Sequence, residues 1–311
     1  MNMISPKQDR NVALVVGPTA SGKSALALDL AKKQPSLIIN ADSAQVYRDL
    51  TVLSARPTED EMQGFEHQLF GYIDGSEACS AARWAGDAKT AIREAHERDF
   101  LPILVGGTGL YVRVLLEGIA PIPDIDPDIR KAVRKLETLE AYEALKKLDP
   151  MSAERLNSKD MTRIQRALEV VRSSGRPLDH WQRQKVGGIA RDITLRPLVL
   201  LPPREWLYQR CDDRFQAMID AGAGEEVQQL LSRNLPANLP VMRAIGVAEI
   251  ASWLAGEISL AAAIERARIA TRQYAKRQYT WFRNQSPPDW QRIEQPLYND
   301  NQDLIETILR N

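Results

Sequence analysis

The chain has 311 residues, of which 44% are hydrophobic and 26% charged, a composition typical of a folded globular protein. Lys plus Arg and Asp plus Glu number 41 each, so the net charge does not indicate a polyanionic partner, and any such partner must be argued from local clusters. No apolar run approaches the roughly 18 to 20 residues that span a membrane, residues 1–10 lack a signal-peptide apolar region, and Cys79 and Cys211 have no metal-type spacing. We therefore expect a cytoplasmic protein with reduced thiols.

A glycine-bounded loop follows the first predicted strand, 12–16, and reads Gly17-Pro18-Thr19-Ala20-Ser21-Gly22-Lys23-Ser24. It has the G-x-x-x-x-G-K-[ST] spacing and opens into a predicted helix that runs to about residue 33. The two glycines allow the loop to aim successive N–H groups at phosphate oxygens. Lys23 would bring positive charge to the outer phosphate, and the Ser24 hydroxyl could hold Mg²⁺. This stretch predicts a phosphate-binding loop, the alternative being a glycine turn that only joins strand to helix.

Strands and helices alternate from this loop to residue 116. A second strand is expected at 37–39, beside the first, and a buried strand at 102–105. Helices are expected at 80–98 and 108–116, a short helix within 57–63, and a weaker strand at 68–73. This alternation predicts a parallel sheet covered by helices on both faces.

The pattern changes after residue 118, where three prolines occur within ten residues. No segment from 128 to 184 reads as a strand, and helices are expected at 129–148, 151–156 and 160–173. A strand at 193–201 then precedes helices at 204–221, 225–233, 247–254 and 260–283, a short strand near Trp290, and a helix at 302–309.

We predict an α/β fold with a P-loop NTPase-like parallel sheet core and an inserted all-helical domain. The first part of the core is 1–119, the insertion is 120–190, and the second part of the core is 191–311, with basic C-terminal helices. The alternative is one domain in which the helices of 120–190 are ordinary crossover connections.

Asp42 is the acidic residue best placed for chemistry. NTP hydrolases commonly end an apolar strand in an Asp that serves the Mg²⁺ shell, but strand 102–105 ends in Gly106-Gly107-Thr108. Asp42 closes the strand 37–39, and the carboxyl ends of neighbouring parallel strands share one crevice. Asp42 could therefore act as a general base, as a water-mediated metal ligand, or as both. An equally weighted alternative is a helix cap formed with Ser43.

Six sequence blocks, in order along nearly the whole chain, resemble the tRNA dimethylallyltransferase family, the isopentenyl-diphosphate:tRNA transferases, in its bacterial form. They are the P-loop, Asp42-Ser43-Ala44-Gln45-Val46-Tyr47, Gly106-Gly107-Thr108-Gly109-Leu110-Tyr111, Gln165-Arg166-Ala167-Leu168-Glu169, Arg243-Ala244-Ile245-Gly246 and Thr271-Arg272-Gln273-Tyr274-Ala275-Lys276-Arg277-Gln278. Each block except the P-loop is weak alone, but the set is specific. The sequence departs from the family pattern at 53–57 and at Val247.

The resemblance implies that dimethylallyl diphosphate gives its five-carbon group to N6 of adenosine 37, in tRNAs that read codons beginning with U, releasing diphosphate. The P-loop, residues 17 to 24, would hold the diphosphate, with Mg²⁺ as cofactor at Ser24. Asp42 matches the family's proposed base, and Thr108 matches a threonine at the substrate crevice. Arg214 matches an arginine assigned to the diphosphate, which suits its fork of donors. The alternative for Arg214 is a surface ion pair with Asp212 or Asp213.

The resemblance also implies contacts with the tRNA anticodon stem-loop, and no membrane or obligate protein partner. The matched positions are Asp42, Ser43, Ala44, Gln45, Thr108, Arg130, Gln165, Arg166, Ala167, Leu168, Glu169, Arg243, Lys276 and Arg277. Independently, 260–283 carries six Lys or Arg against one acid, with aromatic residues interleaved, which is typical of RNA contacts. A solvated basic helix face is the alternative there, and Arg130 could equally pair within its own helix.

Two other functions are compatible with a P-loop and a neighbouring carboxylate. A small-molecule kinase would use Asp42 to activate a hydroxyl toward the γ-phosphate of ATP. A free-adenylate prenyltransferase would transfer the same five-carbon group to free adenine nucleotides.

Overall fold

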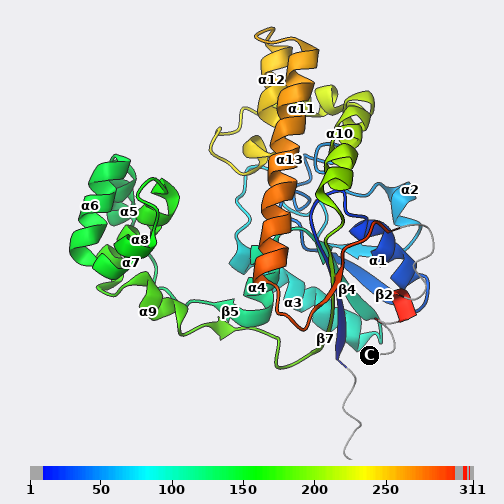
Figure 1. Ribbon diagram of the computed structural model, residues 1–311, viewed down its shortest axis with the longest axis horizontal. Coiled ribbons are helices and arrows are strands. Elements are labelled where there is room, and N and C mark those ends of the chain that lie inside the picture. The colour runs from blue at the N-terminus through cyan, green and yellow to red at the C-terminus, as the bar shows by residue number, and fades with distance from the viewer. Residues whose placement is uncertain (1–9, 298–303, 307, 309–311) are drawn as a thin grey trace, which may run out of the picture. The chain divides into compact units, whose positions relative to one another are not determined.

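The computed structural model describes residues 10–297, 304–306 and 308 (Figure 1). The chain divides into two compact units: the first combines Met1–Leu115 with Ala190–Asn311, and the second is Leu116–Ile189. The insertion expected from the sequence was 120–190. Of the helix expected at 302–309, residues 304–306 and 308 are helical, and the others lie outside the described residues.

A six-stranded sheet forms the centre of the first unit, and its strand pairs are all parallel. The strand order is β3-β2-β4-β1-β7-β8. The strands are β1 (Asn11–Val16), β2 (Ser36–Asn40), β3 (Glu66–Gln68), β4 (Leu101–Gly106), β7 (Thr194–Leu200) and β8 (Gln291–Ile293). This confirms the predicted α/β class.

Two strand predictions need correction. The strand at 37–39 was expected beside the first, but β4 lies between β1 and β2, and its Ile103 is in register with both Ala13 and Ile38. All six residues of β4 are buried, so this strand needs a neighbour along each edge. The strand expected at 68–73 is also wrong in extent: β3 ends at Gln68, and Ile73 makes only an isolated bridge to Tyr47.

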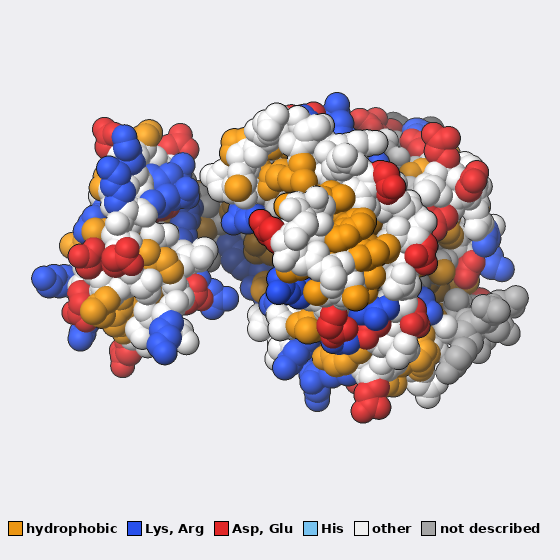
Figure 2. Space-filling view, turned by 90° about the horizontal axis from the view of Figure 1, so that it is seen from above, with side chains coloured by type: hydrophobic (Ala, Val, Ile, Leu, Met, Phe, Trp, Pro, Cys, Tyr) orange, Lys and Arg blue, Asp and Glu red, His pale blue; other side chains and the backbone are white. Residues whose placement is uncertain are grey.

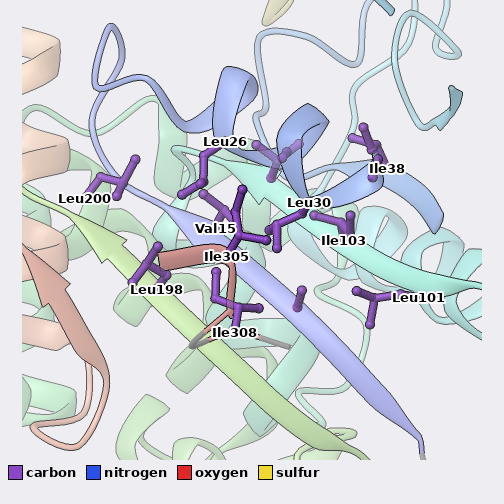
Figure 3. Packing of buried hydrophobic residues seen from close by; sticks show 14 residues of the cluster. Val15, Leu26, Leu30, Ile38, Leu101, Ile103, Leu198, Leu200, Ile305 and Ile308 are labelled. Atoms are coloured by element: carbon purple, nitrogen blue, oxygen red, sulfur yellow. The ribbon is translucent and has the colours of Figure 1, made fainter. Parts of the chain in front are cut away.

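Helices cover both faces of this sheet. On one face α1 (Lys23–Ala31) packs Leu26 and Leu30 against Val15 and Ile103 (Figure 3). On the other, α3 (Ala81–Glu97) packs against β2 and β4, and the Trp84 indole donates a 2.8 Å hydrogen bond to a β2 carbonyl. The connection from β1 through α1 to β2 and the connection from β3 through α3 to β4 cross the sheet in opposite directions. Two right-handed crossovers in opposite directions place their helices on opposite faces.

The other helices named for this unit lie in the segments that follow β2, β4 and β7. They are α2 (Glu59–Met62), α4 (Gly109–Glu117), α10 (Arg204–Asp220), α11 (Ala223–Ser232), α12 (Val247–Leu254), α13 (Leu260–Gln285) and a 3₁₀ turn at Val241–Arg243. α10 and α13 pack against each other through Leu207, Cys211 and Ala275. These two helices carry several of the residues discussed below.

The second unit has a core of its own, made by Val133, Leu145, Ile164 and Leu168. Its elements are α5 (Pro127–Arg134), α6 (Thr138–Leu148), α7 (Pro150–Arg155), α8 (Met161–Ser174), α9 (Leu178–Gln182) and the short antiparallel pair β5 (Gly118–Ile119) and β6 (Val186–Gly187). The single helix expected at 129–148 is therefore wrong. The chain breaks before α6, where the Glu140 carboxylate accepts a hydrogen bond from the Glu137 N–H and starts a new helix.

Candidate active site

The predicted phosphate loop lies at the carboxyl end of β1. A Cβ on Gly17 would lie 2.5 Å from the Leu200 carbonyl oxygen, so only glycine allows this close approach of β7. The Ser21 hydroxyl is 1% exposed and has no hydrogen-bond partner within the described residues. A buried hydroxyl without a partner is costly, so Ser21 is available to a phosphate oxygen.

A cavity of about 330 Å³ lies beside this loop, inside the first unit. Its lining includes Thr19, Asp42, Ser43, Ala44, Arg214, Arg243 and Arg277 among the predicted site residues. A second hollow is lined by Gly22, Lys23 and Ser24, together with Glu61, Arg210 and Arg214. Arg214 lines both spaces, so the structure brings the phosphate loop and the Asp42 carboxylate to neighbouring spaces joined by one guanidinium.

Lys23 is half-buried, and its ammonium donates a 3.1 Å hydrogen bond to the Pro18 carbonyl of the same loop. Burial lowers the pKa of Lys23 to about 8, an effect that the Asp42 charge opposes and the Arg214 charge reinforces. An anion bound in the loop would supply the missing opposite charge. A phosphate group bound in the loop would therefore stabilise the charged form of Lys23.

Asp42 follows β2 and is 8% exposed. Its Oδ1 accepts a 3.0 Å hydrogen bond from the Ala44 N–H, while its own N–H donates to Asn40 Oδ1 at 2.8 Å. The next described helix begins only at Glu59, so the helix-cap alternative for Asp42 and Ser43 is wrong. The local turn therefore holds Oδ1, and Asp42 lines the cavity.

Thr108 follows β4 and belongs to a group of three hydroxyls beside Asp42. Its hydroxyl accepts a 2.9 Å hydrogen bond from the Ser43 N–H and donates to Ser43 Oγ at 3.1 Å. Burial raises the pKa of Tyr274, with the Asp42 charge adding to that shift, while hydrogen bonds with Thr108 and Ser43 oppose it. The Tyr274 phenol therefore stays protonated and can donate to a ligand in the cavity.

Arg214 lies on α10 and reaches the phosphate loop. It donates a 2.9 Å hydrogen bond from a guanidinium nitrogen to Thr19 Oγ1, and burial lowers its pKa. The ion-pair alternative is wrong, because Asp212 pairs with Arg272 at 2.6 Å and Asp213 accepts from Gln209. Arg214 keeps its remaining donors for an anion in the hollow.

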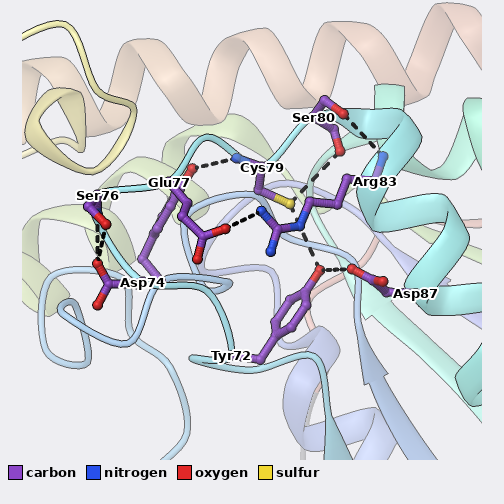
Figure 4. Close-up of polar contacts among 9 residues, drawn as sticks. Tyr72, Asp74, Ser76, Glu77, Cys79, Ser80, Arg83 and Asp87 are labelled. Carbon is purple, nitrogen blue, oxygen red and sulfur yellow. Dashed lines mark hydrogen bonds and ion pairs between the residues drawn. The ribbon is translucent and has the colours of Figure 1, made fainter.

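The cavity lining includes both cysteines of the chain, Cys211 on α10 and Cys79 in the segment before α3. The Cys79 N–H donates to the Tyr47 hydroxyl at 3.2 Å, and the neighbouring Tyr72 hydroxyl donates to Asp87 at 2.7 Å (Figure 4). Burial raises the pKa of Cys211 to about 11, so this thiol is not a nucleophile. The contact between Cys79 and Tyr47 joins two cavity-lining segments of the chain.

The other predicted RNA contacts have different surroundings. In the first unit the Gln45 amide donates to the Ser54 and Ala55 carbonyls at 3.1 and 2.8 Å, and the exposed Arg277 lies over the Tyr274 ring at 5.7 Å. Lys276 is exposed and outside the cavity lining. On the face seen in Figure 2, positive and negative side chains are interspersed on both units.

In the second unit one buried carboxylate, that of Glu169, lies close to three arginine side chains. Glu169 is 3% exposed, and it lies 4.0 Å from Arg130, 3.1 Å from Arg134 and 3.7 Å from Arg166. Arg130 therefore pairs with α8 and not within α5. Ala167 and Leu168 belong to the core, so Arg166 and the half-buried Gln165 are the predicted residues of α8 that reach the surface.

Sequence reasoning missed Glu226 of α11. Its carboxylate accepts hydrogen bonds from three consecutive N–H groups, those of Thr51, Val52 and Leu53, at 2.6, 2.8 and 2.9 Å. The loop that it holds supplies cavity-lining residues 53–55. An acid in the first turn of a helix is ordinary, so no local signal distinguishes Glu226.

We expect Glu226→Gln to lower the free energy of unfolding by about 1–3 kcal/mol, because an amide offers one oxygen and places an NH₂ against the loop N–H groups. Urea denaturation would measure the change. Glu225→Gln, at the neighbouring exposed position, is the matched control and should shift stability by less than about 0.5 kcal/mol. Equal effects of the two substitutions would contradict the role of Glu226.

Among the described residues, no helix could cross a membrane, and no three His, Cys, Asp or Glu side chains are grouped to hold a metal ion.

The chain matches known proteins over most of its length. A family model described as IPP transferase matches residues 45–285, and one described as isopentenyl transferase matches residues 10–76. A tRNA dimethylallyltransferase of Erythrobacter litoralis is 60% identical over 288 residues, or 91% of each chain. One of Sphingopyxis alaskensis is 57% identical over 300 residues, covering 96% of this chain and 98% of the relative.

Solved structures of the same kind are also similar. A tRNA isopentenylpyrophosphate transferase of Bacillus halodurans has a TM-score of 0.71 at 31% identity, covering 97% of this chain and 96% of that one. A eukaryotic dimethylallyltransferase described as acting on tRNA has a TM-score of 0.75 at 30% identity, covering 88% of this chain and 69% of that one.

Proposed function

The chain belongs to the IPP transferase family of tRNA dimethylallyltransferases, and we propose that it prenylates N6 of adenosine 37 in tRNAs that read codons beginning with U. Dimethylallyl diphosphate is the proposed donor, and diphosphate is released. The kinase and free-adenylate alternatives are not favoured, because the matched relatives are tRNA dimethylallyltransferases along almost their whole length. A tRNA substrate is consistent with a cytoplasmic enzyme.

The observation that carries this proposal is the position of Arg214 between two spaces, one lined by the phosphate loop and one by Asp42. The diphosphate would occupy the first, held by loop N–H groups, the Ser21 hydroxyl, Lys23 and Arg214. As the C1–O bond breaks, negative charge grows on the departing diphosphate. Fixed cations and donors at that point lower the barrier most effectively.

Asp42 would act as the general base for the attacking nitrogen, N6 of the adenine. The adenine amine is a weak nucleophile because its lone pair is delocalised into the ring, so loss of its proton must accompany attack. The N6 lone pair forms the bond to C1, the C1–O electrons leave with diphosphate, and the N6 proton passes to the Asp42 carboxylate. The Ala44 N–H holds Oδ1, which leaves Oδ2 for that proton, and the hydroxyls of Thr108 and Tyr274 can orient the base.

The donor set of the second hollow fits Mg²⁺ as a companion of the diphosphate. Ser24 is exposed there, and the Glu61 carboxylate lines the same hollow. Mg²⁺ prefers oxygen ligands and keeps several waters, so it needs few protein ligands when phosphates are present. We propose Ser24 as one ligand. The ion would neutralise part of the charge on the diphosphate.

The tRNA would contact both units. Arg243 and Arg277 line the cavity, and exposed Lys276 lies next to Arg277 on α13, so we propose that all three meet phosphates of the anticodon stem-loop. In the second unit we propose Arg130, Gln165 and Arg166 as further contacts. Adenosine 37 must leave its stack to reach Asp42, as in base flipping.

The test incubates the purified chain with Mg²⁺, radiolabelled dimethylallyl diphosphate and an unmodified tRNA that reads a codon beginning with U. We expect label in the tRNA, and digestion should place it on the adenosine at position 37. A tRNA carrying guanosine at 37 is the control and should stay unlabelled. Label on free AMP or ADP, or ATP consumption without tRNA, would contradict the proposal.

A further inference from the structure

Gln278 of α13 lies between the two loops that carry the proposed chemistry. The residue is 5% exposed. Its Oε1 accepts a 2.8 Å hydrogen bond from the Thr19 N–H of the phosphate loop, and its Nε2 donates a 3.0 Å hydrogen bond to the Gly107 carbonyl. One side-chain amide therefore joins the loop after β1 to the loop after β4.

Each end of this bridge continues to a proposed site residue. On the diphosphate side, Thr19 accepts the guanidinium hydrogen bond of Arg214. On the adenine side, Gly107 precedes Thr108, whose hydroxyl binds Ser43. A Cβ on Gly107 would clash with the Gln278 amide and lie 3.1 Å from Asp42 Oδ2. The amide, Gly107 and the Asp42 carboxylate therefore pack closely together.

The same face of α13 lines the cavity. Tyr274, one turn before Gln278, and Arg277 both line it. Trp281, one turn after, packs on Gly109 and lies under the Arg113 guanidinium at 4.5 Å. The helix that carries the proposed RNA contacts is thus the one that fixes both loops.

We propose that Gln278 is a positioning residue, whose amide holds the diphosphate loop and the Asp42–Thr108 side of the cavity at the separation that the transfer requires. This inference rests on the proposed function. Gln278 touches neither reacting group. It acts through the Thr19 backbone and the Gly107 carbonyl, and a displacement of about 1 Å at a reacting centre can cost about 10²-fold in rate.

The chemistry of the bridge requires one donor and one acceptor on the same side chain. Gln278→Met keeps the approximate volume and removes both hydrogen bonds. Gln278→Glu keeps an acceptor for Thr19 but, when ionised, turns a carboxylate oxygen toward the Gly107 carbonyl. When protonated, the introduced carboxyl can donate to that carbonyl and restore both contacts. Gln285→Met, on the same helix, is the matched control, because it removes one exposed hydrogen bond from Arg113 and touches neither loop.

We expect Gln278→Met to lower the single-turnover rate of label transfer, normalised to the folded fraction, about 10- to 100-fold, with tRNA affinity close to wild type. The thermal midpoint should fall as well, because the substitution leaves two backbone groups unpaired. The activity of Gln278→Glu relative to wild type should rise as the pH falls, because burial and the nearby Asp42 favour the protonated form of the introduced carboxyl. Gln285→Met should behave as wild type.

Three outcomes would overturn the inference. One is a wild-type transfer rate in Gln278→Met, and another is a rate loss that vanishes once rates are normalised to the folded fraction. The third is a ratio of Gln278→Glu to wild type that does not change with pH. Failure of the proposed function is a separate result, since the unaltered chain would then transfer no label to tRNA.

Discussion

Asp42→Asn is expected to lower the single-turnover rate of prenyl transfer by about 10²- to 10⁴-fold, the range that general bases contribute. The asparagine keeps an oxygen for the Ala44 N–H that now binds Oδ1, so the local turn should persist. It cannot accept the N6 proton. Rapid-quench measurement with radiolabelled dimethylallyl diphosphate and saturating tRNA isolates this chemical step, and tRNA affinity should be largely unchanged.

Asp213→Asn is the matched control for this loss. Asp213 is exposed on α10, accepts a hydrogen bond from Gln209, and does not line the cavity. It should therefore turn over as the unaltered chain does. If Asp42→Asn transferred label at a rate near wild type, another group would have to take the proton, and the hydroxyl cluster of Thr108, Ser43 and Tyr274 would be the next to test.

The parts of the fold that could be read from the sequence are those encoded in contiguous stretches. The phosphate loop is one: its glycines, Lys23 and Ser24 lie within eight residues, and the preceding strand and following helix confirm the context. The order of the strands is different. β4 lies between β1 and β2, and all of its residues are buried. A hydrophobic pattern indicates that a strand is buried, but it does not indicate which strands lie beside it.

The site divides in the same way. Asp42 was expected near the phosphate loop because its strand was expected beside β1. β4 separates the two strands, but parallel strands end at the same edge of the sheet, so Asp42 and Thr19 still line one cavity. The helix-cap alternative could be excluded only from the observed turn. The roles of Glu226 and Gln278 could not be found, although Gln278 ends one of the six resembling blocks, because their partners are backbone groups far along the chain. A backbone N–H has no residue identity, so the sequence does not show which segment such a side chain contacts.

Lys23→Ala is expected to lower kcat/KM for dimethylallyl diphosphate by about 10²- to 10³-fold, because it removes a fixed positive charge from the departing diphosphate. The pH dependence gives a second measurement. Burial lowers the pKa of Lys23 to about 8 in the free protein, and kcat/KM reports ionisations of the free enzyme. Lys23 is charged below that pH and neutral above it, so kcat/KM should be sustained below about 8 and fall with unit slope as the pH rises further.

Lys23→Arg separates charge from position in this prediction. A guanidinium stays protonated through the same range, so this variant should lose the fall above pH 8 even if its larger head group lowers the rate at every pH. Inhibition by inorganic diphosphate should follow the same profile, since it probes the loop without the tRNA. If the fall in kcat/KM above pH 8 persisted unchanged in Lys23→Arg, the ionisation would belong to another group. Lys23 would then not be the source of the pH dependence.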